Sequence, residues 1–113
     1  MATARDITRS LERVGLDARD RRHVRKYSLG MKQRAGIAMA LMEAPDLLVL
    51  DEPTNALDEG ARAELAQIIS EERDRGAAVL LSSHDSDFLR DTCDVIYHME
   101  LGRVTLREEV GRE

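Results

Sequence analysis

An uninterrupted apolar run that ends in two acidic residues constrains the fold of this chain more than any other feature. Residues 47–50 are Leu-Leu-Val-Leu, and Asp51 and Glu52 follow them directly before Pro53. A continuous apolar run of this length, bounded by prolines, is typical of a strand buried on both faces, as strands in parallel sheets are. The run predicts an α/β fold with Asp51 at the carboxyl end of a buried strand, where such sheets bind their ligands.

The two carboxylates suit different chemical tasks. Asp51, at the end of the strand, is placed to hold Mg²⁺ directly or through a water while the ion bridges phosphate oxygens. Glu52, one residue further on, points elsewhere and is free to polarise an attacking water. For the pair taken alone, a solvated turn is the alternative interpretation, and only the motifs on either side weigh against it.

Helices and strands are expected to alternate around this run, because apolar residues recur at helical spacing between two continuous apolar segments. We expect helices over residues 7–14, 31–42, 61–76 (ending at Gly76) and 85–92, strands over 47–50 and 77–81, and a terminal hairpin of 94–99 with 103–106. This alternation is typical of a parallel α/β sheet. Residues 18–26 are dense in charge and are expected to form an exposed loop. The two apolar strands need cover on both faces, and only part of it is encoded here.

The composition limits the class of protein. With 113 residues the chain suffices for one small domain or part of a larger one, and 3% aromatic residues leave an aliphatic core. The net charge of -5 argues against general affinity for nucleic acid. The single cysteine, Cys93, allows no internal disulfide and fits a reducing cytoplasm. No apolar run approaches the roughly 20 residues of a membrane-spanning helix, so a membrane role requires a partner.

Three short motifs follow one another along the chain. They are Tyr27-Ser28-Leu29-Gly30-Met31-Lys32-Gln33-Arg34, the run from Asp51 to Asp58, and Ser82-Ser83-His84-Asp85. Together they closely resemble the second half of the nucleotide-binding domain of ATP-binding cassette (ABC) transporters, from about Ile7 onward. The first motif is similar to the version found in bacterial drug, bacitracin and lantibiotic exporters. The resemblance implies the C-terminal part of a P-loop NTPase domain, with helices packed on a partial, mostly parallel sheet and a C-terminal hairpin.

The first motif resembles the signature motif of that family. A serine and a glycine that open a helix form an anion site, because free N–H groups and the positive end of the helix dipole face one spot. The resemblance implies that Ser28, Gly30, Lys32 and Gln33 contact the ATP held by the other subunit of a dimer. Leu29 stands where the family usually has its first glycine. Ser28 also fits an ordinary helix cap, which is compatible with this role.

The second and third motifs supply the remaining expected site residues. By resemblance, Asp51 is the Mg²⁺ carboxylate, and Glu52 is the general base that orients and deprotonates the water. Residues 55–58 match the loop that runs along the dimer interface, and Asp58 belongs to the ATP-binding set. His84 is expected to hydrogen-bond the γ-phosphate and the attacking water, although a single histidine at a strand end is more often a cap or a surface residue.

A glycine-rich phosphate loop is not found in this sequence. Such a loop ends in Gly-Lys-Ser/Thr, and the two lysines here, Lys26 and Lys32, do not follow a glycine. In the family the phosphate loop precedes the signature motif. We therefore expect residues 1–45 to form part of the helical subdomain and residues 46–113 the C-terminal part of the ATPase core. ATP and Mg²⁺ need the missing loop for normal binding, and the isolated chain is expected not to hydrolyse ATP alone.

The leading hypothesis is a partial ATP-binding and ATP-hydrolysing subunit of an ABC transporter. It drives export through a separate membrane permease, pairs with a second nucleotide-binding domain, and lies in the cytoplasm against the inner face of the membrane. A first alternative is a non-catalytic module that completes a partner's ATP site in trans. A second is a DNA-repair or chromosome-maintenance relative, which the negative net charge and the lack of coiled-coil heptads disfavour.

Overall fold

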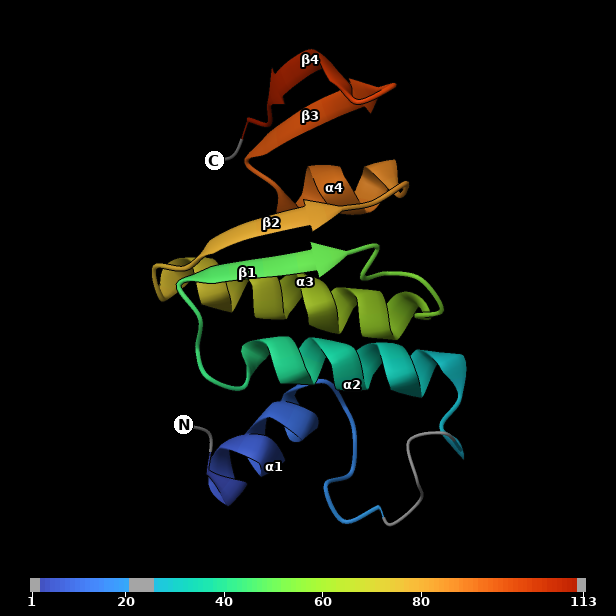
Figure 1. The fold of residues 1–113 in the computed structure, drawn as a ribbon, viewed down its shortest axis with the longest axis vertical. Helices are drawn as coiled ribbons and strands as arrows, with labels where there is room; N and C mark the ends of the chain where they lie inside the picture. Colours follow the sequence, from blue (N-terminus) through green and yellow to red (C-terminus); the bar gives the residue numbers. More distant parts are fainter. Residues whose placement is uncertain (1–2, 21–25, 112–113) are drawn as a thin grey trace.

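Helices and strands alternate along the chain in the order that the sequence predicts. The computed structural model describes residues 3–20 and 26–111, so part of the expected loop over residues 18–26 lies outside it. The elements are α1 (Ala4–Arg13), α2 (Leu29–Leu41), β1 (Leu47–Asp51), α3 (Glu59–Asp74), β2 (Ala78–Ser82), α4 (Ser86–Thr92), β3 (Val95–Glu100) and β4 (Arg103–Glu109) (Figure 1). The expected α/β class, the parallel strand pair and the terminal hairpin are confirmed.

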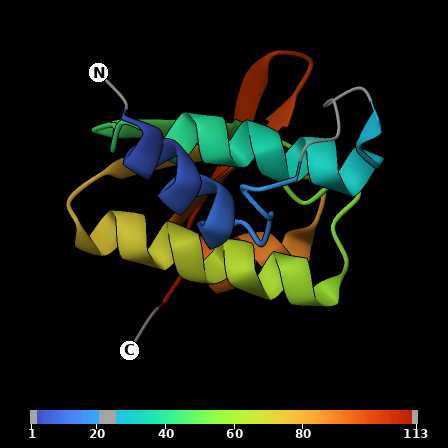
Figure 2. The same ribbon diagram turned by 90° about the horizontal axis from the view of Figure 1, so that it is seen from below.

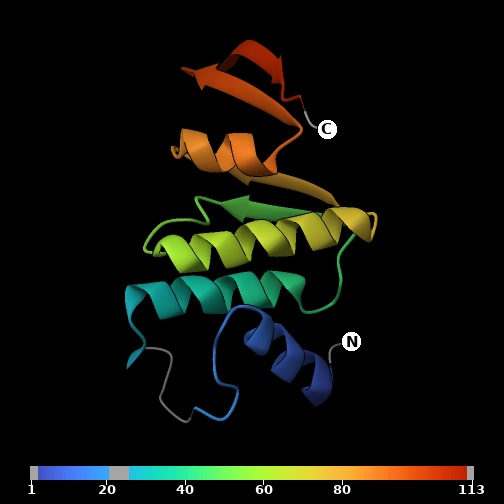
Figure 3. The same cartoon turned by 180° about the vertical axis from the view of Figure 1, so that it is seen from behind.

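The two apolar segments pair with each other as parallel strands. In the described part of the chain, β1 and β2 form a two-stranded sheet whose register runs from Leu47 opposite Ala78 to Asp51 opposite Ser82. The helix α3 connects the two strands and lies against one face of the pair, while α2 runs beside it (Figures 1 and 3). Both strands therefore point their carboxyl ends at the same edge of the sheet.

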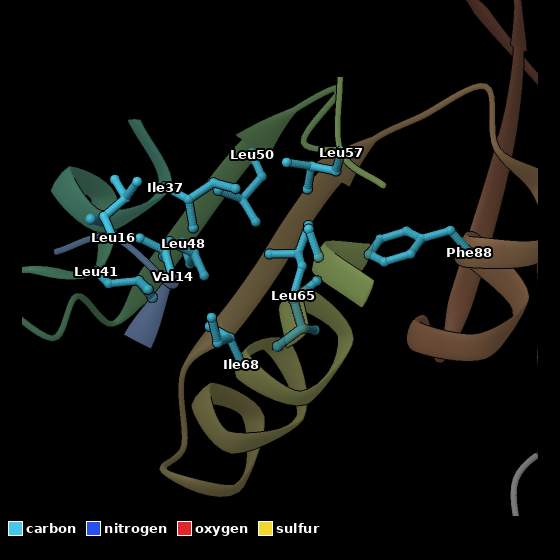
Figure 4. Close-up of a cluster of buried hydrophobic side chains, with 13 residues drawn as sticks. Val14, Leu16, Ile37, Leu41, Leu48, Leu50, Leu57, Leu65, Ile68 and Phe88 are labelled. Atoms are coloured by element: carbon cyan, nitrogen blue, oxygen red, sulfur yellow. The ribbon is translucent and has the colours of Figure 1, made fainter. Parts of the chain in front are cut away.

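The core lies between β1 and the helices. Leu48 and Leu50 alternate along β1 and point toward the helices, and the side chain of Leu48 is only 1% exposed (Figure 4). They pack with Ile37 and Leu41 of α2 and with Leu65 of α3, among others. Seen from below, α1 crosses α2 and α3 and closes the core on that side (Figure 2). The core is aliphatic apart from Phe88, as the composition predicts.

The opposite face of the strand pair is bare. Leu47, Val49 and Leu80 are 57%, 58% and 61% exposed. The continuous apolar sequence of β1 suggests burial on both faces, but buried and exposed residues alternate along the strand. The reason is that α2 and α3 cover one face only (Figure 3). The expectation that only part of the cover is encoded is confirmed for the described residues.

Charged residues fix α1 to the end of α3. The Arg13 guanidinium contacts the carboxylates of Glu71 and Glu72 at 3.2 and 3.4 Å. The Glu72 residue is only 4% exposed, and Arg75 reaches it from the other side at 3.1 Å. Since a buried carboxylate is costly without partners, these two arginines make its burial possible, and Arg13 ties α1 to the end of α3.

The terminal hairpin extends beyond α4. Its strands turn at Leu101 and Gly102, whose φ angles of 49° and 77° are left-handed. An open hollow of about 1420 Å³ lies between β2, α4 and the hairpin. Its lining includes Leu80, Leu89 and Ile96, so the hollow continues the bare apolar face of the sheet.

Glu108 of β4 joins the hairpin to α4. Its carboxylate contacts His98 Nε2 at 2.6 Å and the Arg90 guanidinium at 3.0 Å. These hydrogen bonds, the one with His98 first, lower the pKa of the Glu108 carboxyl below its ordinary value. A lowered carboxyl pKa stabilises the folded state above the unfolded pKa, and that contribution is lost as the pH falls through the folded pKa.

We expect the hairpin of the native chain to loosen between about pH 5 and pH 3. Glu108→Gln removes the titrating group, so its hairpin stability should change less over that range. Hydrogen exchange of the β3 and β4 amides, measured at several pH values in both proteins, tests this. Equal pH dependence in the two proteins would contradict the role of Glu108.

Two neighbouring leucines in β1 test which face of the sheet is packed. Leu48→Ala removes a fully buried side chain and is expected to lower the free energy of unfolding by about 2–5 kcal/mol. Leu47→Ala, the matched control on the exposed face, should change it by less than about 1 kcal/mol. Urea denaturation followed by circular dichroism measures both. Similar losses from the two substitutions would show that the exposed face is also covered.

Candidate functional site

The ends of β1 and β2 meet at one edge of the sheet and bring the second and third motifs together. Asp51 lies opposite Ser82, and the Ser82 hydroxyl donates to Asp51 Oδ1 at 2.5 Å. The next backbone N–H, that of Glu52, donates to the Ser82 carbonyl at 2.9 Å and lies 3.1 Å from the Ser82 hydroxyl oxygen. Ser82 therefore fixes both Asp51 and the start of the following loop.

Glu52 and His84 form the second contact across this edge. His84 Nδ1 lies 2.5 Å from Glu52 Oε1. The His84 side chain is 96% exposed, whereas that of Glu52 is 25% exposed. The arrangement places a carboxylate next to an imidazole that can exchange protons and hydrogen-bond a ligand from solvent. The roles expected for Glu52 and His84 stay predictions.

The backbone at Glu52 leaves the strand in an unusual conformation. Its φ angle is 49°, in the left-handed region that residues other than glycine rarely adopt. The Glu52 carbonyl accepts hydrogen bonds from the Asn55 N–H at 3.2 Å and from Gln33 Nε2 at 2.9 Å. Gln33 thus reaches from α2 to the loop that carries the carboxylate.

The remaining expected site residues lie at helix starts. The Ser28 hydroxyl caps α2 by accepting from the Met31 N–H at 3.1 Å, and Asp58 caps α3 by accepting from the Ala61 N–H at 2.8 Å. Lys32, in the first turns of α2, is exposed. Among the described residues, no contact brings Ser28 or Lys32 to these carboxylates, so their expected roles toward a partner's ATP stay predictions.

The oxygen groups at the sheet edge fit Mg²⁺ only in part. Asp51 and Ser82 present hard oxygen donors, which this ion prefers. Among the described residues there is no group of three or more His, Cys, Asp or Glu side chains that could hold a metal. Mg²⁺ is commonly bound by one or two carboxylates together with substrate phosphates and water, and this donor set suits that mode.

Comparison with known proteins agrees with these motifs. A family model described as ABC transporter matches residues 2–55. The Bacillus subtilis (strain 168) protein described as uncharacterized ABC transporter ATP-binding protein YybJ is 44% identical over 110 residues, which are 97% of this chain and 50% of YybJ. The chain belongs to the ABC transporter ATPase family. The lantibiotic transport ATP-binding protein SrtF of Streptococcus pyogenes is 42% identical over 99 residues, 88% of this chain and 43% of SrtF.

Solved ABC ATPase structures share the fold. The dimeric post-hydrolysis structure of the ATP-binding cassette MJ0796, bound to ADP and Pi, matches with a TM-score of 0.87 and 26% identity. The match covers 96% of this chain and 47% of that one. This ABC ATPase chain therefore spans about half the length of the relatives it matches. Within its described residues, no helix is long and apolar enough to cross a membrane.

Two contacts at this candidate site were not predicted from the sequence. The bridging role of Ser82 depends on the strand register, although its place at the end of an apolar run is a weak signal. The contact from Gln33 to the Glu52 carbonyl joins residues 19 apart, and no local pattern indicates it. Both features depend on packing between elements.

The carboxylate–histidine pairs give a spectroscopic test of the site. Glu52→Gln is expected to shift the ring resonances of His84 and to leave those of His98 unchanged, because each histidine contacts a different carboxylate. Glu108→Gln, the matched control, should shift His98 alone. Two-dimensional NMR of the imidazole groups records His84 and His98 in one sample. If Glu52→Gln left the His84 signals in place, the contact would not exist in solution.

Proposed function

We propose that this chain forms the C-terminal portion of an ATP-binding subunit that drives export through a separate membrane subunit. The meeting of Asp51 with Ser82, and of Glu52 with His84, at the carboxyl ends of two parallel strands carries this proposal. The similarity to SrtF, whose name describes lantibiotic transport, supports a role in transport. Such a subunit lies in the cytoplasm, peripheral to the inner face of the membrane.

In the proposed mechanism, the described residues divide the work on ATP. Asp51 would hold Mg²⁺, which would supply positive charge beside the phosphate oxygens. Glu52 takes a proton from the attacking water, and His84, at 2.5 Å from Glu52, orients that water and contacts the γ-phosphate. The start of α2, with Ser28, Gly30 and Lys32, contacts the ATP of a second nucleotide-binding domain. Asp58 lies in the loop that runs along the interface between the two domains.

The bare face of the sheet supports an assembly with a phosphate-binding half. Leu47, Val49 and Leu80 leave an apolar surface that a stable domain covers, and the hollow beside the hairpin continues it. In this proposal residues 1–45 belong to the helical subdomain and residues 46–113 to the ATPase core. A polypeptide with a phosphate loop packs on the bare face and supplies most of the affinity for ATP.

A second candidate is a non-catalytic module that completes a partner's ATP site. The exposed start of α2, with Ser28 capping the helix and Lys32 open to solvent, favours it. In that case Glu52 performs no chemistry in this chain. The two candidates differ in whether Glu52 matters for hydrolysis once a phosphate loop is present.

A chimera tests the choice between them. The half of YybJ that precedes the matching region is fused to this chain, and Mg-ATP hydrolysis is measured. We expect hydrolysis by the chimera and a loss of about 10²-fold or more in kcat for Glu52→Gln, because a positioned base is removed. Glu64→Gln, an exposed carboxylate on α3, is the matched control and should leave kcat unchanged.

Calorimetry of the 113-residue chain with Mg-ATP complements the chimera. No micromolar binding is expected without a phosphate loop, and such binding would contradict the half-site proposal. A chimera that hydrolyses ATP equally well with Glu52→Gln would favour the non-catalytic module. A folded chimera that binds no ATP would argue against both.

A further inference from the structure

We infer that Gln33 is a positioning residue that holds Glu52 of its own chain in place, and not a ligand of ATP. This inference rests on the proposed function, since it assigns Gln33 a part in the reaction of Glu52. The side-chain amide of Gln33 donates to the Glu52 carbonyl at 2.9 Å and is partly buried there. This hydrogen bond uses one of the two amide N–H groups of Gln33 and turns the amide toward the loop of its own chain.

Glu52 needs support because its backbone is in an unfavourable conformation. A φ of 49° at a residue with a long side chain costs free energy, and such conformations persist only where neighbouring groups over-determine them. Ser82 holds the Glu52 N–H, whereas Gln33 and the Asn55 N–H hold its carbonyl. Ser82 ends β2 and Asn55 lies in the same loop as Glu52, so of these three only Gln33 comes from a helix.

A second contact joins the same face of α2 to the same loop. A methyl group added at Gly30 would lie 2.8 Å from the Ala56 carbonyl oxygen, so the absence of a side chain permits this close approach. Ala56 itself has a left-handed φ of 63°. Gly30 and Gln33 are three residues apart and therefore lie on one face of the helix. The start of α2 thus contacts the loop after β1 at both residues with a left-handed φ, Glu52 and Ala56.

The consequence concerns where the Glu52 carboxylate points. Peptide planes on both sides of Glu52 are fixed by these hydrogen bonds, and its side chain then reaches His84 at 2.5 Å. If the carbonyl is released, the φ of Glu52 can relax and the carboxylate leaves His84. Ser28, which caps α2, faces a partner in the proposed function, whereas Gln33, further along the helix, serves its own chain.

Hydrogen exchange and NMR of the 113-residue chain test this inference without ATP. Gln33→Met keeps the length of the side chain but removes the donor. It is expected to make the Asn55 amide exchange about threefold to tenfold faster and to move the His84 ring resonances toward those of Glu52→Gln. Gln67→Met, an exposed position on α3, is the matched control and should change neither signal. Gln33→Lys restores a donor, so its Asn55 exchange rate and His84 resonances should lie between those of Gln33→Met and those of the native chain.

Gly30→Ala against Gly36→Ala gives an independent comparison on the same helix. An alanine at residue 30 must displace the Ala56 carbonyl, whereas a methyl group at residue 36 meets no atom within 4 Å. The first variant should therefore change the Asn55 exchange and the His84 resonances, and the second should not. This pair decides the question even if Gln33→Met unfolds.

The chimera separates positioning from ligand binding. Gln33→Met is expected to lower kcat about tenfold and to leave the KM for ATP unchanged, because it misplaces the base and removes no contact to substrate. A raised KM with unchanged Asn55 exchange and unchanged His84 resonances would overturn the inference and restore Gln33 as an ATP ligand. The NMR readouts need no hydrolysis. They can therefore contradict the role of Gln33 while the proposed ATPase function stands, and a chimera without activity can contradict that function while the NMR results support Gln33.

Discussion

The parallel pairing of β1 with β2 is the interaction on which the rest of the structure depends. Its register puts Asp51 opposite Ser82, and the hydrogen bond between their side chains follows from that pairing. A slip by one residue would turn Leu48 and Leu50 away from the helices and expose them. Burial of these two leucines thus fixes the register, and the register places the carboxylates.

Local patterns were enough to predict most of the fold. Helical spacing of apolar residues marks most of the elements within a few residues, and the second and third motifs lie at the ends of β1 and β2. The helix expected to start near Met31 begins at Leu29, because Ser28 caps it there. Contacts that depend on packing were not predictable in this way. Gln33 was expected to face ATP, but its amide is engaged by the Glu52 carbonyl, 19 residues along the chain.

The bare sheet face explains a tension between the sequence and the structure. A continuous run from Leu47 to Leu50 is typical of burial on both sides, yet only alternate residues are buried. The apolar residues on the open side contribute nothing to the packing of the described chain. Their presence is understood if the strands are part of a larger sheet, which agrees with the match to about half the length of YybJ and of MJ0796.

Two adjacent carboxylates at the end of one strand reach different partners because the chain changes conformation between them. Asp51 still belongs to the strand, so the register alone directs it to Ser82. Glu52 has left the strand with a left-handed φ, so its direction depends on what holds its two peptide planes. Ser82 holds one and Gln33 the other. The Asp51 carboxylate is therefore placed by the sheet, whereas the Glu52 carboxylate is placed jointly by the sheet and by α2, so a movement of that helix affects Glu52 and leaves Asp51 in place.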